Sequence, residues 1–545
     1  MNILGLSTLD PSAFGHDSSA AILDDDSNLF AISEERLSRI KHDGGYPSNS
    51  IQTCLNQKNL TLSNIDNVSV GFGLEKQQMG KIIKKNFCSF AKDSGYKNTA
   101  LEKKNPIFYD HQYIHARTGF AFSGFNKALV ICLDGGGVDN GIPNSGGIFI
   151  VENGDIRPIK YFPMYHSLGL TYGNITEICG FTMSDGEGKT MTLAPMAENR
   201  SQKDKKEIYE HMCKIFPNFK GMTVKSNGGV TFSSIFRHES TIFSIEDTRL
   251  LLLKRLYDKN LIAWAAQKRI EYIVIDLVTD VIDNFGIKNI IFSGGIFLNM
   301  IMNMKIQEKF GGNANLFFNP ICSDHGNAIG AILEKFFQET GKNPISPNMS
   351  LSLGTSYSDE EILLSANRFN FKIKKVNKID TGIDLIERGK VVGWFQGRSE
   401  FGPRGLGNRS ILALSTDERY KNIVNKKVKK RESWRPFCPT IIAEKSNDFL
   451  NNSLPAPYMI LGFNMKNPEL YPAVSHIDGT CRPQILEKHV NPDFYHVVRG
   501  LGGIVLNTSF NLAGDPIVET PHDALMTLKN SEMDAILMND FLIEK

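Results

Sequence analysis

The sequence of 545 residues lacks several features that would mark particular protein classes. Its eight cysteines form no CxxC pair, so a zinc ribbon is not expected, and reduced thiols fit a cytoplasmic protein. No stretch reaches about 18 uninterrupted apolar residues, and the opening MNILGLSTLD has no positively charged leader, so we expect neither a membrane span nor a signal peptide. The formal net charge is only +2, so no global field points to nucleic acid or to an anionic membrane.

Strand and helix patterns alternate along the chain, which predicts an α/β fold. MNILGLST, SSAAILDDD and NLFAISEER have the pattern of strands joined by turns, and residues 127–163 repeat it with KALVICLDGGGVD and GGIFIVENGDIRPIKYFP. Two such units, each followed by helices, indicate an internally duplicated domain. Residues 244–285 have helical spacing, and residues 339–358, rich in Pro, Asn, Ser and Gly, predict a linker to a second domain.

A histidine pair in YDHQYIHARTGFAF indicates a metal site. His111 and His115 are four residues apart, so a helix would place both imidazoles on one face, where they can hold one ion. The alternative is a pair of hydrogen-bonded histidines at a helix start. Asp134, before three glycines, and Asp324, in a loop, can complete the set, although each also suits an ordinary turn. Imidazoles with carboxylates suit iron, manganese or zinc.

Glycine-containing turns after strands can present backbone amides to a phosphate group. GHDSSAA, SGGIFLN and DGEGKTMTLAP are segments of this kind, and together they resemble the nucleotide cleft of actin-like folds more than any one does alone. Each is also compatible with an ordinary turn. The candidate nucleotide-binding residues are Asp17, Gly135, Gly136, Lys189, Gly294, Gly295 and Asn299.

Residues 397–439 combine basic side chains with glycine and proline. In GRSEFGPRGLGNRS a rigid backbone can fix Arg side chains that bind planar oxyanions such as phosphate. For KNIVNKKVKKRE the alternatives are a solvated cationic helix face or a nucleic-acid patch, but no aromatics are interleaved for base stacking. The candidate oxyanion-binding residues are Arg404, Arg409, Lys429, Arg431, Arg435 and Arg482.

The segment NTSFN follows the buried-strand pattern GGIVL. Asn507 and Ser509 would therefore lie at the carboxyl end of a strand, which is a usual ligand position in open α/β sheets. A capping motif is the alternative, and the sequence alone does not choose between the two.

A series of motifs in this chain resembles the O-carbamoyltransferases of nodulation-factor and antibiotic biosynthesis. They run in the family's order from residue 15 to residue 523, nearly the whole chain. The motifs are GHDSSAA, DHQYIHA, GLTYGNITEICGF, SGGIFLN, SDHGNAIGA, GRSEFGPRGLGNRS, VKKRESWRPFCP, APYM, SHIDGTCRPQ and LNTSFNLAGDPIVETPHDA.

The resemblance implies two domains. Residues 1–345 would form an actin-like (ASKHA) domain, like that of the tRNA threonylcarbamoyl-transfer enzymes, and residues 346–545 would form a YrdC-like domain. The second domain would make carbamoyl adenylate from carbamoyl phosphate and ATP, with release of pyrophosphate. The first would transfer the carbamoyl group to a hydroxyl of a sugar or natural product, with release of AMP.

The resemblance also implies roles for individual residues. A divalent metal, iron before manganese or zinc, would be held by His111, His115, Asp134 and Asp324, and magnesium would accompany ATP. Carbamoyl phosphate and the adenylate would contact Arg404, Lys429, Arg435, Arg482, Asn507 and Ser509. The candidate catalytic residues are Lys429, Arg404 and His16, the last of which would deprotonate the acceptor hydroxyl. Gln112 departs from the family, which often has a second consecutive histidine there.

Two other functions share parts of this pattern. One is tRNA threonylcarbamoyl transfer, against which the complete C-terminal motif series and the modest net charge argue. The other is a non-catalytic nucleotide-binding scaffold, which would need neither the histidine pair nor the basic set. We expect a small-molecule or glycan acceptor, no nucleic-acid or membrane partner, and a monomer or homodimer.

Overall fold

The chain has a mixed α/β fold, which confirms the predicted fold class. The computed structural model describes residues 1–7, 16–71, 106–225, 248–345, 347 and 349–545. Contacts divide the chain into a central unit, Ile3–His16 with Ile65–Pro347, and a C-terminal unit, Met1–Asn2 with Asp17–Asn64 and Asn348–Lys545. The domain boundary expected at residue 345 stays a prediction, because contacts alone do not show which parts fold independently. No helix among the described residues is long and apolar enough to cross a membrane.

The same set of strand pairings occurs twice along the chain. β1 (Ile3–Ser7), β4 (Asn67–Gly71) and β5 (Ile107–Tyr109) pair in parallel, as do β6 (Lys127–Asp139), β11 (Asn289–Ser293) and β12 (Asn315–Phe318). Each set is accompanied by an antiparallel hairpin: β2 (Ser19–Leu23) with β3 (Leu29–Ser33), in the C-terminal unit, and β7 (Ile142–Glu152) with β8 (Asp155–Pro163). The repeated order agrees with the duplication that the sequence predicts.

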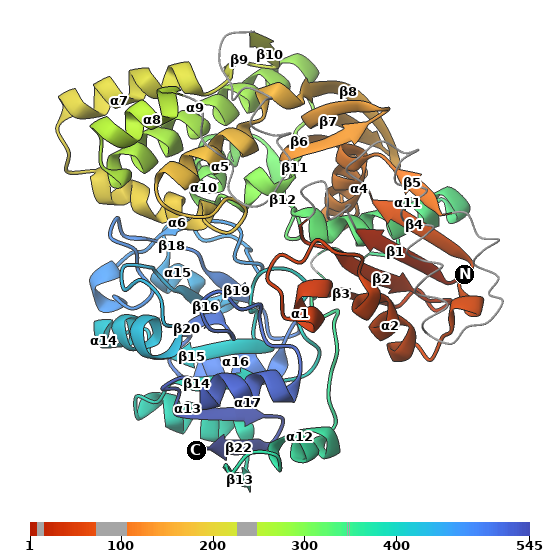
Figure 1. The fold of residues 1–545 in the computed structure, drawn as a ribbon, viewed down its shortest axis with the longest axis vertical. Coiled ribbons are helices and arrows are strands. Elements are labelled where there is room, and N and C mark those ends of the chain that lie inside the picture. The colour runs from red at the N-terminus through yellow and green to blue at the C-terminus, as the bar shows by residue number, and fades with distance from the viewer. Residues whose placement is uncertain (8–15, 72–105, 226–247, 346, 348) are drawn as a thin grey trace. The chain divides into compact units, whose positions relative to one another are not determined.

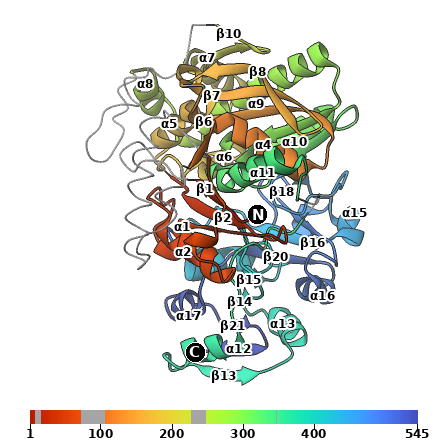
Figure 2. The ribbon, with the colours of Figure 1, turned by 90° about the vertical axis from the view of Figure 1, so that its right-hand side faces the viewer.

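Two helices of the central unit pack side by side and against its strands. They are α4 (His111–Ser123) and α11 (Asn327–Thr340), which are adjacent in Figures 1 and 2. The predicted helical stretch forms α8 (Thr248–Leu256) and α9 (Lys259–Phe285). The other elements are α5 (Leu168–Ile178), α6 (Glu187–Leu193), α7 (Gln202–Ile215), β9 (Asn218–Lys220), β10 (Thr223–Lys225) and α10 (Met300–Phe310).

The C-terminal unit contains an eight-stranded mixed sheet. Its order is β13 (Lys372–Lys375), β22 (Phe541–Glu544), β21 (Ala535–Met538), β14 (Val392–Phe395), β15 (Arg409–Ala413), β20 (Ile504–Ser509), β16 (Cys438–Ile442) and β19 (Gln484–Leu486). Helices α13 (Lys378–Glu387) and α16 (Pro492–Gly500) cover one face, where Trp394, Phe494 and Leu537 form a buried core. This core fixes the sheet on which the basic residues lie.

Shorter elements complete the C-terminal unit. They are α1 (Glu34–Ser38), α2 (Ser48–Gln57), α12 (Asp359–Ala366), α14 (Glu418–Asn422), α15 (Ser446–Phe449), β17 (Phe463–Asn464), β18 (Thr480–Cys481) and α17 (Pro521–Lys529). The described residues between α11 and α12 contain no helix or strand, in agreement with the predicted linker. A buried ion pair and hydrogen bonds tie α1 to the rest of the unit, since Arg36 donates to the Gly402 carbonyl at 2.8 Å and lies 3.8 Å from the Glu519 carboxylate.

Close backbone packing of α11 on β1 generates the first prediction. A Cβ added at Gly5 would overlap the Ala328 carbonyl and the Ile332 side chain, whereas one added at Gly188, inside α6, would meet nothing. Gly5→Ala should therefore destabilise the protein by about 1–3 kcal/mol, because it forces α11 off the sheet. Gly188→Ala should be neutral or stabilise by about 0.5–1 kcal/mol. Thermal unfolding measures both, and equal midpoints for the two variants would contradict the packing described.

Candidate metal centre and anion site

The histidine pair lies on α4 as its spacing predicts. His111 and His115 are one turn apart, and both are almost completely buried. Their rings meet edge to face with centroids 4.7 Å apart, and their Nε2 atoms are 3.2 Å apart. Both imidazoles therefore present the same ring nitrogen to one point beside the helix.

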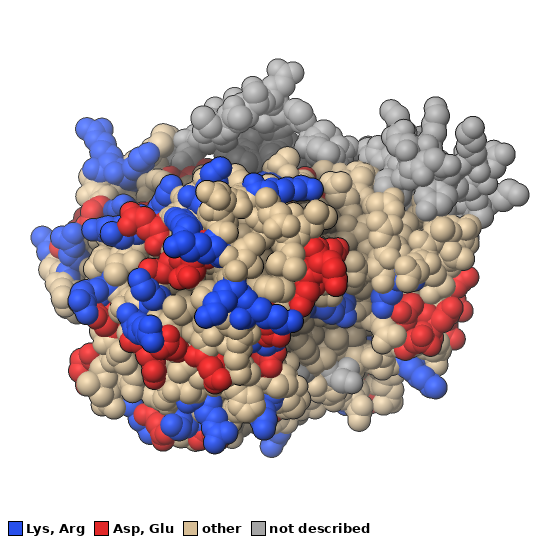
Figure 3. Space-filling model, turned by 90° about the horizontal axis from the view of Figure 1, so that it is seen from below, with Lys and Arg blue, Asp and Glu red and all other residues tan. Residues whose placement is uncertain are grey.

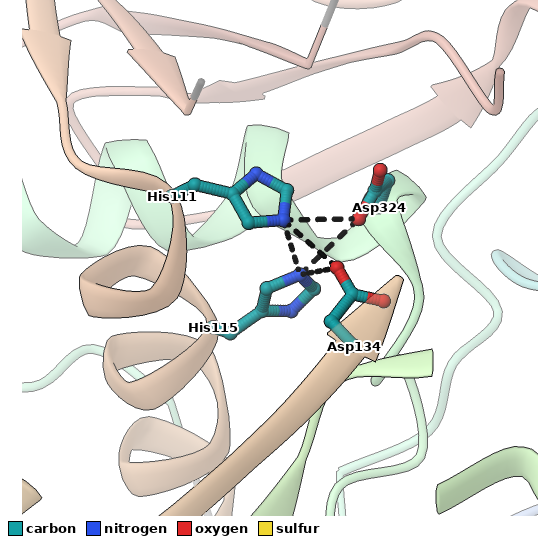
Figure 4. Close-up of side chains that lie close together, drawn as sticks. All are labelled: His111, His115, Asp134 and Asp324. Atoms are coloured by element: carbon teal, nitrogen blue, oxygen red, sulfur yellow. Dashed lines mark hydrogen bonds and ion pairs between the residues drawn. The ribbon is translucent and has the colours of Figure 1, made fainter. Parts of the chain in front are cut away.

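Two carboxylates face that point from other elements (Figure 4). Asp134 Oδ2 lies 2.9 Å from His111 Nε2 and 3.5 Å from His115 Nε2. Asp324 Oδ1 lies 3.6 Å and 3.2 Å from the same two nitrogens. The structure therefore brings together all four residues that the sequence assigned to a metal.

Glycines allow the backbone to come close enough for Asp134 to reach the two histidines. The register between β6 and β7 shifts between Leu133 and Gly137, so Asp134 sits at an irregularity in its strand. A Cβ at Gly137 would overlap the His111 ring, and one at Gly294, where φ is +92°, would overlap the Leu133 carbonyl. The following amide, Gly295 N–H, donates to Asp134 Oδ1 at 3.2 Å. The Gly-Gly turn thus orients a carboxylate.

Hydrogen bonds to the backbone hold the other members in place. Asp324 begins the turn Asp324–Gly326 that leads into α11, and Ser7 Oγ donates to its carbonyl at 2.8 Å. Ser293 Oγ, at the end of β11, donates to the His115 carbonyl at 2.8 Å. Asp324 and His115 are therefore each fixed by a serine at the end of a neighbouring strand.

The four groups strongly perturb one another's protonation. Burial lowers the pKa of His115, but its hydrogen bonds to Asp134 and Asp324 outweigh this and raise the pKa to about 10. The pKa of His111 is also raised, because the attraction of the two carboxylates exceeds the effect of burial. Burial alone would raise the pKa of Asp134, yet the two imidazoles hold it well below its usual range. A bound cation would replace the protons that otherwise balance this charge.

The donor set fits a divalent transition metal. Ligand atoms about 2.0–2.2 Å from a tetrahedral ion lie about 3.4 Å from one another. The five separations that involve an imidazole nitrogen run from 2.9 to 3.6 Å, and all four donor atoms lie within 4.8 Å of one another. Two imidazole nitrogens with two carboxylate oxygens suit iron, manganese or zinc.

The remaining candidate nucleotide-binding residues have varied surroundings. Gly135 and Gly136 lie in the irregular part of β6, and a Cβ at Gly136 would overlap Met164. Lys189 on α6 pairs with Asp185 at 3.3 Å. Asn299 caps α10 by accepting from Met302 N–H at 3.0 Å, and its side chain also contacts Gln267. These contacts give each residue a structural task, and nucleotide binding by them stays a prediction.

His16 and Asp17 border residues 8–15, which lie outside the described part of the chain. His16 is half-buried. Asp17 has a φ of +64° and its Oδ1 lies 2.7 Å from His42 Nδ1. The role of His16 as a base therefore stays a prediction.

In the C-terminal unit, a buried lysine forms the centre of the basic cluster. Lys429 is 2% exposed, and its Nζ donates to the Ser509 carbonyl at 2.6 Å, to Ser509 Oγ at 3.3 Å and to Asn511 Oδ1. Burial and the nearby charges of Arg431, Arg435 and Lys41 lower its pKa well below the ordinary lysine value. An oxyanion bound here would relieve this excess of positive charge.

Strand alternation explains which side chains join Lys429. Val505, Asn507 and Ser509 share one face of β20, and Cys438 at the start of β16 pairs with Asn507. Val505 belongs to the core under α16, whereas Asn507 and Ser509 lie further along the strand. The same face therefore passes from an apolar core to a polar end, and Arg482 contacts Cys438 at that end.

Two further arginines adjoin this polar end. Arg431 Nε donates to Asn425 Oδ1 at 2.7 Å, and its guanidinium stacks 4.8 Å from the Phe437 ring centre. Burial, together with Arg435, lowers the pKa of Arg431, and the charge of Arg482 acts in the same direction. The structure thus groups Lys429, Arg431, Arg435 and Arg482 in one electrostatic neighbourhood.

The sequence assigned Arg409 to anion binding, but the structure places its side chain away from Lys429 and Ser509. Ser410 pairs with Ser509, so Arg409 points to the opposite face of the sheet. Its guanidinium is fully buried and stacks 3.7 Å from the Phe395 ring centre. It donates to the carbonyls of Gln396, Gly397, Asn408 and Thr355. A guanidinium committed in this way stabilises the loop, and we assign Arg409 a structural role.

The glycine-rich loop after β14 is built around a buried carboxylate. Glu400 accepts from the N–H groups of Leu406 at 2.6 Å, Asn408 at 2.7 Å and Arg409 at 3.1 Å. These amides are therefore occupied and do not form a phosphate cradle. Arg404 is half-buried in the same loop.

Sequence reasoning missed Asn511 as a member of the anion site. It lies two residues beyond Ser509, accepts from Lys429, and also accepts from Ser509 Oγ at 2.8 Å. The signal was present in the spacing of NTSFN, where two polar residues flank Phe510 at the end of a buried strand. The side chain of Phe510 itself is fully buried.

Replacing a ligand residue should remove the metal. His111→Ala should weaken metal binding about 100-fold or more, because one of four donors is lost and a buried carboxylate is left uncompensated. His211→Ala, on α7 and outside the cluster, is the matched control. Elemental analysis of the purified proteins measures bound iron, manganese and zinc. Equal metal content in His111→Ala and wild type, or none above background in wild type, would contradict the site.

Comparisons with known proteins agree with the resemblance. Residues 2–333 match the family model described as carbamoyltransferase N-terminus, and residues 383–545 match carbamoyltransferase C-terminus. The nodulation protein NolNO of Sinorhizobium fredii is 30% identical over 98% of this chain and 80% of its own length. An uncharacterized protein of Methanocaldococcus jannaschii is 33% identical over 97% and 98%. The 3'-hydroxymethylcephem-O-carbamoyltransferase of Streptomyces clavuligerus is 28% identical over 46% and 47%. The chain belongs to the carbamoyltransferase family.

Proposed function

We propose that this protein is an ATP-dependent O-carbamoyltransferase that makes carbamoyl adenylate and transfers its carbamoyl group to a hydroxyl. The observation that carries the proposal is the buried cationic cluster around Lys429, in a chain that matches both carbamoyltransferase models. Asp515 only partly offsets the charge of a buried ammonium beside two guanidinium groups, and a phosphoryl oxyanion would supply further negative charge. The substrates that bring such oxyanions are carbamoyl phosphate and ATP.

The first half-reaction belongs to the C-terminal unit. Water cleaves the P–O bond of carbamoyl phosphate, so inorganic phosphate leaves and carbamate remains. A carbamate oxygen attacks the α-phosphorus of ATP, pyrophosphate leaves with magnesium, and carbamoyl adenylate forms. Lys429, Arg431, Arg435 and Arg482 offset the phosphoryl charge, and Ser509 and Asn511 hold the Lys429 ammonium in place. Exclusion of bulk water limits loss of the labile intermediate.

The second half-reaction belongs to the central unit. The acceptor hydroxyl oxygen attacks the carbonyl carbon of carbamoyl adenylate, AMP leaves, and the hydroxyl proton passes to a base, for which His16 is our candidate. His111, His115, Asp134 and Asp324 would hold a metal, which we propose to be iron, with manganese or zinc as the alternatives. When bound, that ion supplies positive charge for a nucleotide phosphate or for the carbamoyl oxygen.

We propose that the acceptor is a sugar or natural-product hydroxyl, because the name of the cephem enzyme indicates a natural-product hydroxyl acceptor for that relative. A nucleic-acid acceptor would call for a broad basic surface. On the face drawn in Figure 3, lysine and arginine side chains are interspersed with aspartate and glutamate. This distribution favours a small acceptor over an extended polyanion.

Pyrophosphate release tests the first half-reaction. Wild type should release pyrophosphate from ATP only when carbamoyl phosphate is present. Lys429→Ala should slow this release about 100-fold or more, because the buried charge that faces the phosphoryl group is lost. Lys427→Ala, two residues earlier but exposed and paired with Glu532 at 2.8 Å, should keep nearly full activity. Absence of pyrophosphate from wild type would refute the proposed function.

The lowered pKa of Lys429 predicts a pH dependence for substrate binding. Burial and neighbouring cations disfavour the ammonium form in the free enzyme, whereas a bound phosphoryl dianion favours it, so binding is coupled to proton uptake at pH values above the lowered pKa. KM for carbamoyl phosphate should therefore rise as pH increases, by up to about tenfold per pH unit above the lowered pKa. Lys429→Arg should flatten the profile, because a guanidinium stays protonated. A wild-type KM that is constant or falls with rising pH would contradict this.

A further inference from the structure

The Arg482 side chain is held by a cysteine. Its Nε and Nη2 atoms each lie 3.3 Å from Cys438 Sγ, so two donors on one edge of the guanidinium share one sulfur acceptor. Within the part of the chain that the structure describes, this sulfur is the only hydrogen-bond acceptor of the Arg482 guanidinium. The contact therefore fixes the plane of the guanidinium and leaves the Nη1 donors for another partner.

The pairing of β16 with β19 brings the two segments of this contact together. β16 and β19 pair in parallel with Thr440 opposite Gln484. Cys438 lies two positions before Thr440 on β16, and Arg482 lies two positions before Gln484 in the segment that leads into β19, so both residues are near the same end of the sheet. Thr440 Oγ1 donates to Gln484 Oε1 at 2.8 Å and locks the two strands together. The Cys438 sulfur is thus held by a strand of the sheet, and the Arg482 side chain takes its position from that sulfur.

Arg482 needs a fixed hydrogen-bond partner because its other neighbours are positively charged. Arg431 and Arg435 share its electrostatic neighbourhood, and like charges would drive a flexible guanidinium away from them. Ordering a long arginine side chain also costs about 1.5–2 kcal/mol of conformational entropy. A sulfur acceptor already in place before substrate arrives lowers both costs.

We propose that Cys438 is a positioning residue for substrate binding: its sulfur orients Arg482 so that the remaining guanidinium donors face the oxyanion held by Lys429. This inference rests on the proposed function, because the oxyanion is taken to be the phosphoryl group of carbamoyl phosphate. Cys438 touches no reacting atom in this account and acts only through Arg482. Its effect should appear in the KM for carbamoyl phosphate and not in kcat.

A double-mutant cycle with Cys438→Ala and Arg482→Ala tests the proposal through pyrophosphate release. Cys438→Ala should raise KM for carbamoyl phosphate roughly tenfold, with kcat and the KM for ATP within about twofold of wild type. In the Arg482→Ala background the same change should have no further effect. Cys438→Ser should restore KM to near the wild-type value, because its hydroxyl oxygen accepts the same hydrogen bonds. Cys213→Ala is the matched control, since Cys213 is the other half-buried cysteine among the described residues.

An unchanged KM in Cys438→Ala, or an equal rise with and without Arg482, would overturn the proposal even if wild type is active. If wild type releases no pyrophosphate, the proposed function fails separately, and calorimetric titration with inorganic phosphate then decides the positioning role. Phosphate binding that weakens in Cys438→Ala only when Arg482 is present would support the role. Equal affinity in wild type and Cys438→Ala would overturn it.

Discussion

Both sites depend on one constraint, the high free-energy cost of removing charge from water. In the central unit, the buried carboxylates of Asp134 and Asp324 are balanced by two imidazoles, and a metal ion would balance them more fully. In the C-terminal unit the balance is incomplete, because neutral oxygens and other cations surround the buried Lys429, and Asp515 offsets their charge only in part. The first arrangement is suited to retaining a cation, and the second is suited to binding an anion.

Local backbone features bring these charges together. Where the chain approaches His111, a glycine at position 137 leaves room for the ring, and the positive φ of Gly294 lets the next amide reach Asp134. In the other unit, β16, β19 and β20 share a face that is apolar under α16 and polar at its far end. Glycine packing therefore positions the charged side chains in the central unit, and strand alternation positions them in the C-terminal unit.

The sequence predicted which four residues lie together, the histidine pair from its spacing and the two aspartates from the family resemblance, and metal binding by them stays a prediction. A spacing of four residues places His111 and His115 on one helical face, and strand ends or turns present Asp134 and Asp324. The orientation of Arg409 could not be predicted from the sequence, since only strand pairing reveals that it points away from Ser509. The sequence also did not reveal that Glu400 accepts hydrogen bonds from the loop amides, or that Cys438 contacts Arg482. These depend on tertiary pairings that no single segment encodes.

The account gives the two units successive tasks, activation at an anion site and transfer near a metal site. Its central claim is that ATP is cleaved between the α- and β-phosphorus, not at the terminal phosphate. Phosphorus NMR of wild type with ATP and carbamoyl phosphate, without any acceptor, tests this most directly. The account predicts inorganic phosphate and pyrophosphate in equal amounts, with carbamoyl adenylate or AMP as the nucleotide product. ADP as the nucleotide product would contradict it.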